Sequence, residues 1–524
     1  MCAIIQFAAI LSQFSQKAHT TPELYLPFVF FAHLLSQFLF FAALVIINPE
    51  RAQRDFMKKT VLFYLCLHCS LCLLAQQDLG IQNSNYAGIR GSLLNPASIA
   101  DSKLKCDVNI LSGDVVFANT FLYAPKSSVP FLGFKKVIEG SIHENLFETR
   151  FDPQNVNKLY NLTVSTEILG PSLFIKVAKK HELGLTVAAR AYGNVRHITG
   201  NLGQNAFDYF LSSNGWNTTF RDQSARVNAM AWLEYGLHYA TVISDRGLNE
   251  IKGGISLNYL QGVGAIYAKN TNVTYKVVDT TAMVFSNTTL DYGRTDFDDL
   301  RNLHDRRHGH GFGADVGVTF LHFNTDKDKG KDNYLYRIGI SLLDLGRINF
   351  NRNTGSYHLS AASAVFNNWH EASFTDNKQL DQTLSAVFYN GDSSHSQTGT
   401  SFHMAMPSAL SIQADWHIDQ YFFANLTIVK GFGHGDNVGV VSPDVYGLTP
   451  RYETQWFEVS LPMSLIYYNH WQSRMGVAVR VGYFFFGGDA PGSLLKINNL
   501  QQADLYAGIH YFVPEKLKHS INNF

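Results

Sequence analysis

The segment from Gly311 to His322 presents two chemically different faces within one short run of residues. Successive side chains of a β-strand point to opposite sides, so alternate residues share a face. One face is apolar, and the other is small and glycine-rich with a single carboxylate. The apolar face holds Phe312, Ala314, Val316, Val318 and Phe320, and the opposite face holds Gly311, Gly313, Asp315, Gly317 and Thr319. This contrast is typical of a membrane-barrel strand whose inner face lines a crowded or watery lumen.

The same alternation recurs along most of the chain, at residues 172–177, 183–192, 475–483 and 504–511. Within these runs Arg190 and Arg480 occupy mid-strand positions on the face opposite the aliphatic side chains, as Asp315 does in its own strand. Inside a barrel such groups project into water or pair with each other, without the cost of placing a charge in lipid. Arg190, Asp315 and Arg480 are therefore the candidate lumen-facing residues.

The composition agrees with a membrane barrel. Charged residues make up 16% of the chain and aromatics 13%, whereas a soluble domain usually carries about a quarter charged residues. The mean hydropathy is near zero, which excludes a helical polytopic membrane protein. It agrees with a barrel, whose strands are apolar only at alternate positions. The formal net charge of +0 provides no basic field for binding nucleic acid.

The predicted fold is all-β, a single transmembrane antiparallel β-barrel of about 14 strands within a range of roughly 12 to 16, if each strand with its loop takes about thirty residues. Aromatic runs at apparent strand ends, residues 421–423, 467–471 and 483–486, indicate girdles at the two membrane interfaces. The longer polar intervals, 199–227, 286–308, 351–400 and 487–503, are predicted to be extracellular loops. A soluble secreted β-sandwich is the alternative fold.

The N-terminal region has a second start signal inside it. Residues 57–75 carry a basic start, an apolar core and Ala75 at the expected cut, which predicts a secretory signal peptide and a mature chain beginning at Gln76. Residues 1–56 contain another apolar segment at 24–47, which is either a membrane anchor or part of an over-extended N-terminus. The second interpretation is preferred, because so complete an internal signal would otherwise be a coincidence.

The remaining chain divides into an N-terminal loop or plug segment at 76–105, the barrel at 106–515 and a C-terminal tail at 516–524. Four of the five cysteines lie before the proposed cut, which leaves Cys106 alone in the mature protein. No intramolecular disulfide and no cysteine-based zinc site is then expected.

Two polar clusters have the residue types of metal ligands. Arg306 and Arg307 interrupt the first and a strand follows it, so a solvated loop is preferred to a transition-metal site. The second lacks the bidentate glutamate of a calcium loop and reads as a hairpin tip. The first contains His304, Asp305, His308 and His310, and the second contains Asp326, Asp328, Gly330 and Asp332. No nucleophile elbow or phosphate-binding loop occurs, so no catalytic, metal or cofactor residue is predicted and the protein is not expected to be an enzyme.

Four short phrases of the sequence are shared with a known group of proteins. They are Leu-Asn-Pro-Ala at 94–97, Leu-Leu-Asp-Leu-Gly-Arg-Ile at 342–348, Met-Pro-Ser-Ala at 406–409 and the aromatic run at 483–488. In these phrases the chain resembles an uncharacterised family of Bacteroidota outer-membrane β-barrels, related in style to fatty-acid-transporter-like and type IX secretion-associated barrels. The resemblance implies a barrel in the cell outer membrane and transfers no catalytic residue.

The expected function is non-enzymatic: an outer-membrane barrel for passive uptake or binding of a small or hydrophobic solute. The alternatives are a structural scaffold of a secretion or surface-attachment assembly, and a soluble secreted β-sandwich binding protein. The expected partners are outer-membrane lipid, a small-molecule substrate of unknown identity and other envelope proteins, with no nucleic acid. A transporter predicts an open lumen or one closed by residues 76–105, whereas a scaffold predicts a lumen filled by side chains.

Overall fold

The structure is a computed structural model. It describes residues 78–123, 125, 148–152, 155, 157–208, 210, 213–296, 307–329, 333–372, 374, 376–433, 435, 438–467, 471–490 and 501–515. The predicted signal peptide, the region before it and the tail at 516–524 lie outside these residues.

One antiparallel sheet forms the wall, and it closes because the last strand pairs with the first, with Val115 opposite Leu505. Seven wall strands are continuous: β1 (Leu104–Asn119), β6 (His181–Thr199), β9 (Asn249–Val277), β17 (Phe422–Gly431), β18 (Asp444–Glu453), β23 (Phe484–Gly488) and β24 (Gln502–Pro514). Seven more are interrupted once or twice but continue along the same neighbours.

The interrupted strands are β4–β5 (Leu159–Leu169, Ser172–Ala178), β7–β8 (Thr219–Asp222, Arg226–Arg246), β10–β11 (Ala282–Thr295, Gly309–His322), β12–β13 (Tyr336–Phe350, Thr354–Asn367), β14–β15–β16 (Gln397–Gly399, Phe402–Ala405, Ala409–Asp419), β19–β20 (Phe457–Ser460, Met463–Tyr467) and β21–β22 (Trp471–Met475, Val477–Val481). The barrel therefore has 14 strands, as the sequence predicts. A sheet closed on itself is not a sandwich, so the β-sandwich alternative is wrong.

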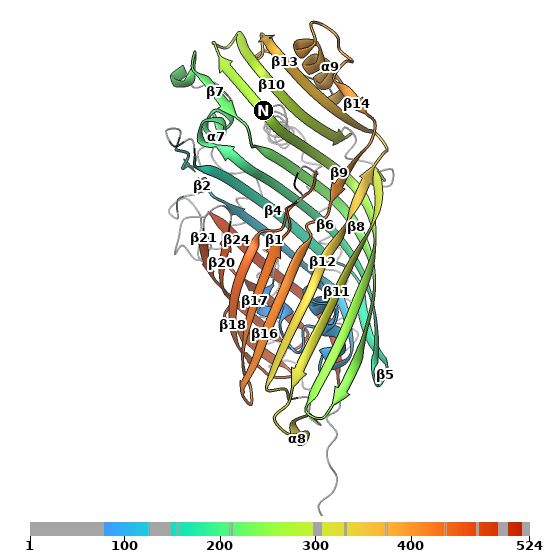
Figure 1. Cartoon of the computed structure of the whole chain (residues 1–524). Coiled ribbons are helices and arrows are strands. Elements are labelled where there is room, and N and C mark those ends of the chain that lie inside the picture. The colour runs from blue at the N-terminus through green and yellow to red at the C-terminus, as the bar shows by residue number, and fades with distance from the viewer. Residues whose placement is uncertain are drawn as a thin grey trace, which may run out of the picture.

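The two ends of the barrel differ (Figure 1). The lower end has short turns, such as the one at Gly247 and Leu248, together with α8 (Asp326–Lys329), the start of β1 and the end of β24. The upper end carries the longer connections, which include β2 (Leu122–Tyr123), β3 (Glu148–Thr149), α7 (Gly200–Phe207), η3 (Ser213–Gly215) and α9 (Asn377–Phe388).

On one side the wall continues upward as an extension built from β9, β10 and β13 with their neighbours (Figure 1). Two of the intervals predicted as loops, 286–308 and 351–400, are therefore partly strand, because β10 runs to Thr295 and β13 fills 354–367. The interval 199–227 likewise contains β7. These strands are rich in Ser, Thr and Asn and lack the lipid-facing apolar alternation, so their pairing was not visible in the sequence pattern.

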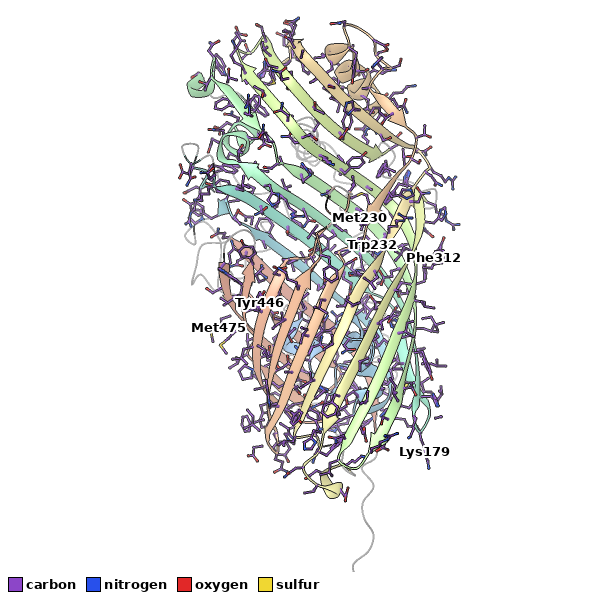
Figure 2. The ribbon with its side chains drawn as sticks, in the orientation of Figure 1. Lys179, Met230, Trp232, Phe312, Tyr446 and Met475 are labelled. Atoms are coloured by element: carbon purple, nitrogen blue, oxygen red, sulfur yellow. The ribbon has the colours of Figure 1, made fainter. Side chains whose placement is uncertain are left out.

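A belt of exposed apolar side chains surrounds the lower part of the barrel. In β11, Phe312 is 72% exposed and Val316 and Val318 are each 45% exposed, while Asp315 between them is 9% exposed. Phe312 and Met475 project outward from opposite sides of the barrel in Figure 2. Similar exposed Leu, Ile, Val and aromatic side chains occur on the other lower-wall strands, so the belt runs round the whole circumference.

Aromatic rings mark both edges of this belt. At the upper edge Tyr259 lies 6.3 Å from Tyr235 and 5.7 Å from Phe312, measured between ring centroids. At the lower edge Phe320 lies 6.2 Å from Tyr336. Eight residues of strand separate Phe312 from Phe320, about 27 Å along the strand and about 20 Å after the usual tilt of a barrel strand. The belt thus approaches the height of the apolar band of a membrane barrel.

Above the belt, helices cover apolar side chains of the extension. α9 packs on β10 and β13, where Phe388 lies 5.2 Å from Phe285 and Asp381 accepts a hydrogen bond from Tyr292. Leu202 of α7 joins the same buried cluster. Among the described residues, no helix is long and apolar enough to cross a membrane.

Candidate functional site

The first described stretch of the chain, from Asp78 onward, lies inside the barrel (Figure 1). We refer to residues 78–103 as the luminal segment; it contains α4 (Leu79–Gln82), η2 (Gly88–Leu93) and α5 (Ser98–Asp101). Almost all of its residues are buried. It packs against wall strands from both the first and the last third of the chain, because Ile89 belongs to a buried cluster with Phe174 and Phe512, and Ile81 to another with Phe485.

Glycines on the inner wall make room for the segment. A Cβ at Gly254 would stand 2.5 Å from the amide nitrogen of Ala97, and one at Gly317 would overlap the side-chain oxygen of Asn95. Contacts this short do not occur for real side chains, so only glycine permits the Asn-Pro-Ala turn to approach the wall. Asn95 then donates hydrogen bonds to Thr319 and Gln413. The glycine-rich face of the 311–322 strand is therefore the surface on which the segment rests.

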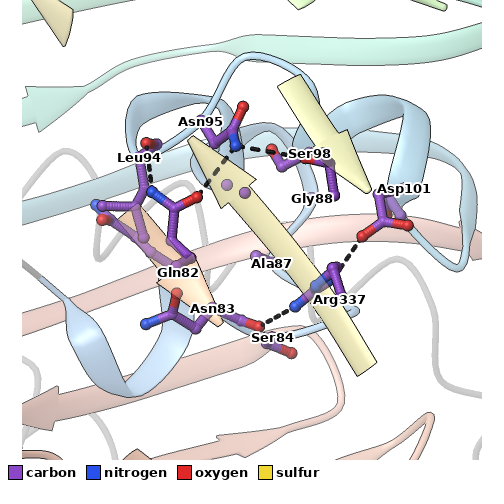
Figure 3. Close-up of a pocket in the computed structure, with 15 residues that line it drawn as sticks. Gln82, Asn83, Ser84, Ala87, Gly88, Leu94, Asn95, Ser98, Asp101 and Arg337 are labelled. Carbon is purple, nitrogen blue, oxygen red and sulfur yellow. Dashed lines mark hydrogen bonds and ion pairs between the residues drawn. The ribbon is translucent and has the colours of Figure 1, made fainter. Parts of the chain in front are cut away.

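Buried ion pairs tie the segment to the wall at its lower end. Asp101 accepts from Lys252 at 3.0 Å and from Arg337 at 2.6 Å, and Figure 3 shows Arg337 joining Asp101 to the backbone of Asn83. Burial alone would raise the pKa of the Asp101 carboxyl, but the two cations outweigh it and hold that pKa below its ordinary value. This end of the lumen is filled, with a residual cavity of only about 40 Å³.

A second charged layer adjoins the first. Arg451 binds Asp415 at 2.7 Å and Glu453 at 2.8 Å, and Glu453 accepts from the side chain of Asn85 at 2.8 Å. Arg480 binds Glu458 at 3.1 Å and is fully buried. Charges buried in this way cost free energy unless they are paired. These pairs lie within the wall, and the segment adds neutral donors to their carboxylates, from Asn85 to Glu453 and from Ser84 to Glu458.

Above the luminal segment lies a larger cavity of about 90 Å³, which we call the chamber. It has room for several water molecules, since one needs about 10–15 Å³. Its wall combines charged with apolar side chains: Gln82, Leu93, Leu94, Asp114, Glu167, Arg190, Tyr192, Asp315, Leu343, Asp344, Pro407, Ala409, Val429 and Ser442.

A bulge in β12 supplies the chamber with one of its carboxylates. Ala314 pairs with Leu345 but Val316 pairs with Leu342, so Leu343 and Asp344 both stand opposite Asp315. Asp344 adopts a left-handed backbone with φ of 52°, which is uncommon for a residue other than glycine and turns its side chain inward. Ser408 stabilises the bulge by donating to the Asp344 carbonyl at 2.7 Å.

Arg190 lies at the centre of the chamber's charge network. Its two terminal nitrogens bind the two oxygens of Asp344 at 2.7 and 2.9 Å, and Glu234 and Glu167 lie 3.1 and 3.4 Å away. The guanidinium stands 5.1 Å from the ring of Trp232. Asp315 accepts from the Asp344 amide at 2.6 Å and from Asn258 at 2.9 Å.

A connection from the upper end closes the chamber from above. Residues 438–442, which we call the strap, lie in the link between β17 and β18 and cross the interior to β6. The Val441 amide donates to Asn194 at 2.7 Å, and Asn194 and Tyr192 both donate to the Val441 carbonyl at 3.2 Å. Val440 is completely buried in the same cluster as Trp232. The chamber is thus bounded by the luminal segment below and the strap above.

A family of unknown function, DUF5723, matches residues 96–489. The chain belongs to this family. The match begins within the Leu-Asn-Pro-Ala turn of the luminal segment and spans the wall as far as the end of β23. The strap and the chamber residues from Asp114 onward fall inside the DUF5723 region, whereas Gln82, Leu93 and Leu94 precede it. No curated protein matches the chain.

Several solved structures are similar to this DUF5723 protein. They include a TodX monoaromatic hydrocarbon channel deltaS2 mutant, with 8% identity, TM-score 0.40 and coverage of 82% of this chain and 95% of that one. The Ralstonia pickettii toluene transporter TbuX has 9% identity, TM-score 0.36 and coverage of 82% and 95%. A Pseudomonas aeruginosa FadL homologue has 8% identity, TM-score 0.35 and coverage of 80% and 91%. At these values the likeness does not extend to a function.

The three charged residues singled out from the sequence lie in two different places in this DUF5723 protein. Arg190 and Asp315 line the chamber, whereas Arg480 is buried in the layer near the luminal segment. The expected pairing of Asp315 with an arginine takes an indirect form, because Asp344 stands between Asp315 and Arg190. Sequence reasoning missed Asp344 and the strap; the break of alternation at Leu342-Leu343-Asp344 was the available sign of the bulge.

The two polar clusters give no metal site in the described part of the chain, where no group of three His, Cys, Asp or Glu converges as ligands. His308 bonds the Arg352 carbonyl at 2.9 Å, and His304 and Asp305 lie outside the described residues. Asp326 and Asp328 belong to α8 at a hairpin tip, while Gly330 and Asp332 are also outside the described part.

Proposed function

We propose that this protein is a non-enzymatic barrel of the outer membrane that admits a small solute through the chamber. The observation that carries the proposal is the chamber itself: a cavity with a mixed charged and apolar lining, left unfilled in the interior of a closed barrel between the luminal segment and the strap. A wall whose only task was structural would gain stability by filling that space.

The apolar belt supports the membrane location. Exposed aliphatic side chains on every side, bounded by aromatic rings above and below, match the surface that membrane barrels present to lipid. Since short turns face the periplasm in such barrels, the lower end is the periplasmic end and the extension with α9 stands outside the cell. In this orientation a solute from outside meets the strap before it meets the luminal segment.

The two boundaries of the chamber differ in how firmly they are held. The luminal segment is fixed by buried ion pairs at Asp101 and by the Asn85–Glu453 contact. The strap is held across the lumen by neutral hydrogen bonds to Val441. Neutral hydrogen bonds contribute less than charge-assisted ones, so the strap opens more readily and the luminal segment acts as the plug.

Removal of the strap's anchor tests the proposal. Asn194→Ala leaves the Val441 amide without its partner and should speed the entry of small sugars into liposomes that contain the purified protein. Asn270→Ala removes a comparable buried side chain from the extension, where Asn270 bonds Asp222, and should leave entry unchanged. If wild type and Asn194→Ala both exclude every small solute, the barrel is not an uptake route.

A scaffold for an envelope assembly is the second candidate. It is favoured by the filled lower lumen and by the extension, which places β10, β13 and α9 beyond the belt. The same liposome assay separates the two functions, because a scaffold remains sealed in both variants.

The mature chain is proposed to begin at Gln76, after a signal peptide at 57–75. This start leaves only two residues before the buried Asp78. The exported chain would therefore begin almost at the first residue of the luminal segment. Intact-mass measurement of the outer-membrane form tests it, and peptides from residues 20–56 in that fraction would contradict it.

A further inference from the structure

Carboxyl groups outnumber cations around the chamber. Among the described residues, Asp114, Glu167, Asp315 and Asp344 line it together with a single cation, Arg190. Arg90 lies 3.8 Å from Asp114 but binds Asp78 more closely, through Nε at 2.7 Å. Carboxylates in excess over cations make such a cavity attractive to a further positive charge.

One carboxylate oxygen in the lining has no partner. Glu167 is 5% exposed, and its Oε1 accepts no hydrogen bond, while its other oxygen stands 3.4 Å from Arg190 Nε. A buried acceptor without a donor is costly, and a ligand that brings an N–H group to it removes that cost. This acceptor belongs to a side chain that lines the chamber and already stands beside Arg190.

Arg190 shows which kind of cation the wall accepts. Its planar guanidinium is bound by a carboxylate in bidentate fashion and lies near an indole ring, the two contacts that suit guanidinium and ammonium ions. The carboxylates of Asp344 and Glu167 both approach Arg190, and no group of three metal ligands converges in the part of the chain described. Leu93, Leu343 and Val429 add apolar surface for an alkyl chain.

We propose that the chamber binds a small organic monocation, an alkylammonium or alkylguanidinium, with its charged head at Glu167 and its alkyl chain against the apolar lining. The site rests on the contacts above; its role as the solute selected for entry rests in addition on the proposed uptake function.

Calorimetric titration of the folded full-length chain in detergent tests the binding, with butylammonium as the probe. Butyrate has a similar chain and the opposite charge, and sodium is a small inorganic cation. Butylammonium should bind, while butyrate should not. Displacement of butylammonium by equimolar sodium, or equal binding of butyrate, would overturn the assignment.

Two matched variants locate the site. Glu167→Gln should weaken butylammonium binding by about tenfold or more, the usual effect of losing a hydrogen bond to a charged group. Glu182→Gln makes the same change at a buried carboxylate of β6 outside the chamber lining and should leave the affinity unchanged. Equal losses in both would show that the site is elsewhere. A folded mobility on unheated gels confirms that each variant has assembled.

Liposome entry of butylammonium then separates this inference from the uptake function. Binding without entry overturns the uptake function and leaves the cation site in place. Entry of neutral sugars through a protein that does not bind butylammonium overturns the cation site and leaves uptake in place.

Discussion

At the scale of single residues, the two faces of each strand in the lower wall have different surroundings. Val316 faces outward and is 45% exposed, whereas Gly317 next to it faces the luminal segment so closely that a methyl group does not fit. Glycine here serves the packing of the interior rather than flexibility of the strand. The outer residue is set by lipid and the inner one by the luminal segment.

The outer face predicts a position-dependent effect of charge. Val316→Arg should impair assembly, because a cation at mid-membrane on the lipid face costs about 2–4 kcal/mol. Val365→Arg is the matched control: Val365 is 44% exposed on β13 in the extension, where water replaces lipid. Unfolding in urea from liposomes measures both. Equal destabilisation would contradict the membrane location of the belt.

The inner face predicts an effect of a single methyl group. Gly254→Ala should displace the Asn-Pro-Ala turn and destabilise the protein by about 1–3 kcal/mol, the usual range for overpacking, because the new Cβ meets backbone at Pro96 and Ala97. Gly313→Ala is the control, since its Cβ finds Leu260 at an ordinary 3.5 Å. Limited proteolysis of the luminal segment reports the displacement. A segment that stays protected in both variants would show that the wall adapts.

The sequence predicted the alternation of β11 because lipid imposes it on every second residue. It could not predict the purpose of the glycines, since that depends on residues 95–97, more than two hundred positions away in the chain. Nor could it predict Asp344 beside Arg190, because one extra residue in β12 changes which side chains face inward.

At the scale of elements, the luminal segment and the wall form one charged unit. Asp101 is 3% exposed and neutralises cations from two strands that are themselves far apart in sequence, Lys252 of β9 and Arg337 of β12. Residues 76–105 were assigned from sequence as either a loop or a plug. The ion pairs of Asp101 with Lys252 and Arg337 show that this segment is tethered to the wall, which the sequence alone does not reveal.

Removing the tether should release the segment. Asp101→Asn removes the buried carboxylate that Lys252 and Arg337 share and leaves them with Glu250 and Asp415, at 3.5 and 3.2 Å. Breaking a buried pair completely costs about 3–5 kcal/mol, so the loss expected here is smaller. Residues 78–103 should become more sensitive to protease, and the midpoint of unfolding in urea should fall. Asp444→Asn is the control, since it removes an ion pair to the largely exposed Lys430 and should change little. A luminal segment that stays protected in Asp101→Asn is held by packing alone.

Low pH should release the luminal segment in the wild-type protein, as Asp101→Asn does. The folded-state pKa of Asp101 is below the ordinary 3.8, so its stabilisation is complete above that pH and is lost as the pH falls through the lower folded value. In Asp101→Asn this part of the acid dependence should be absent.

The extension shows what the sequence could not predict at the scale of elements. Without lipid on the outer face, β10 and β13 carry no strict alternation of apolar and polar residues.

At the scale of the whole molecule, the closed wall and the apolar belt predict a heat-modifiable protein. The folded chain should migrate faster than the boiled chain on detergent gels, because a barrel with no free edge resists unfolding in mild detergent. It should fractionate with the outer membrane. A folded form in the soluble periplasmic fraction would contradict the belt as a lipid surface.

The number of strands was predictable from the length of the chain, whereas the pair of strands that closes the barrel was not.

The pairing of β1 with β24 has a consequence for the order of assembly. The seam joins the first and last strands, with Val115 opposite Leu505, so the cylinder is complete only when the end of the chain arrives. Contacts this distant in sequence form slowly. The luminal segment is attached directly to β1, and its buried polar contacts with β9, β12 and β18 do not depend on the seam. Its apolar packing does depend on the seam, because Ile81 and Ile89 share clusters with Tyr506 and Phe512 of β24. The charged half of the interior can therefore form while one side is still open, and the last strand then completes the apolar half.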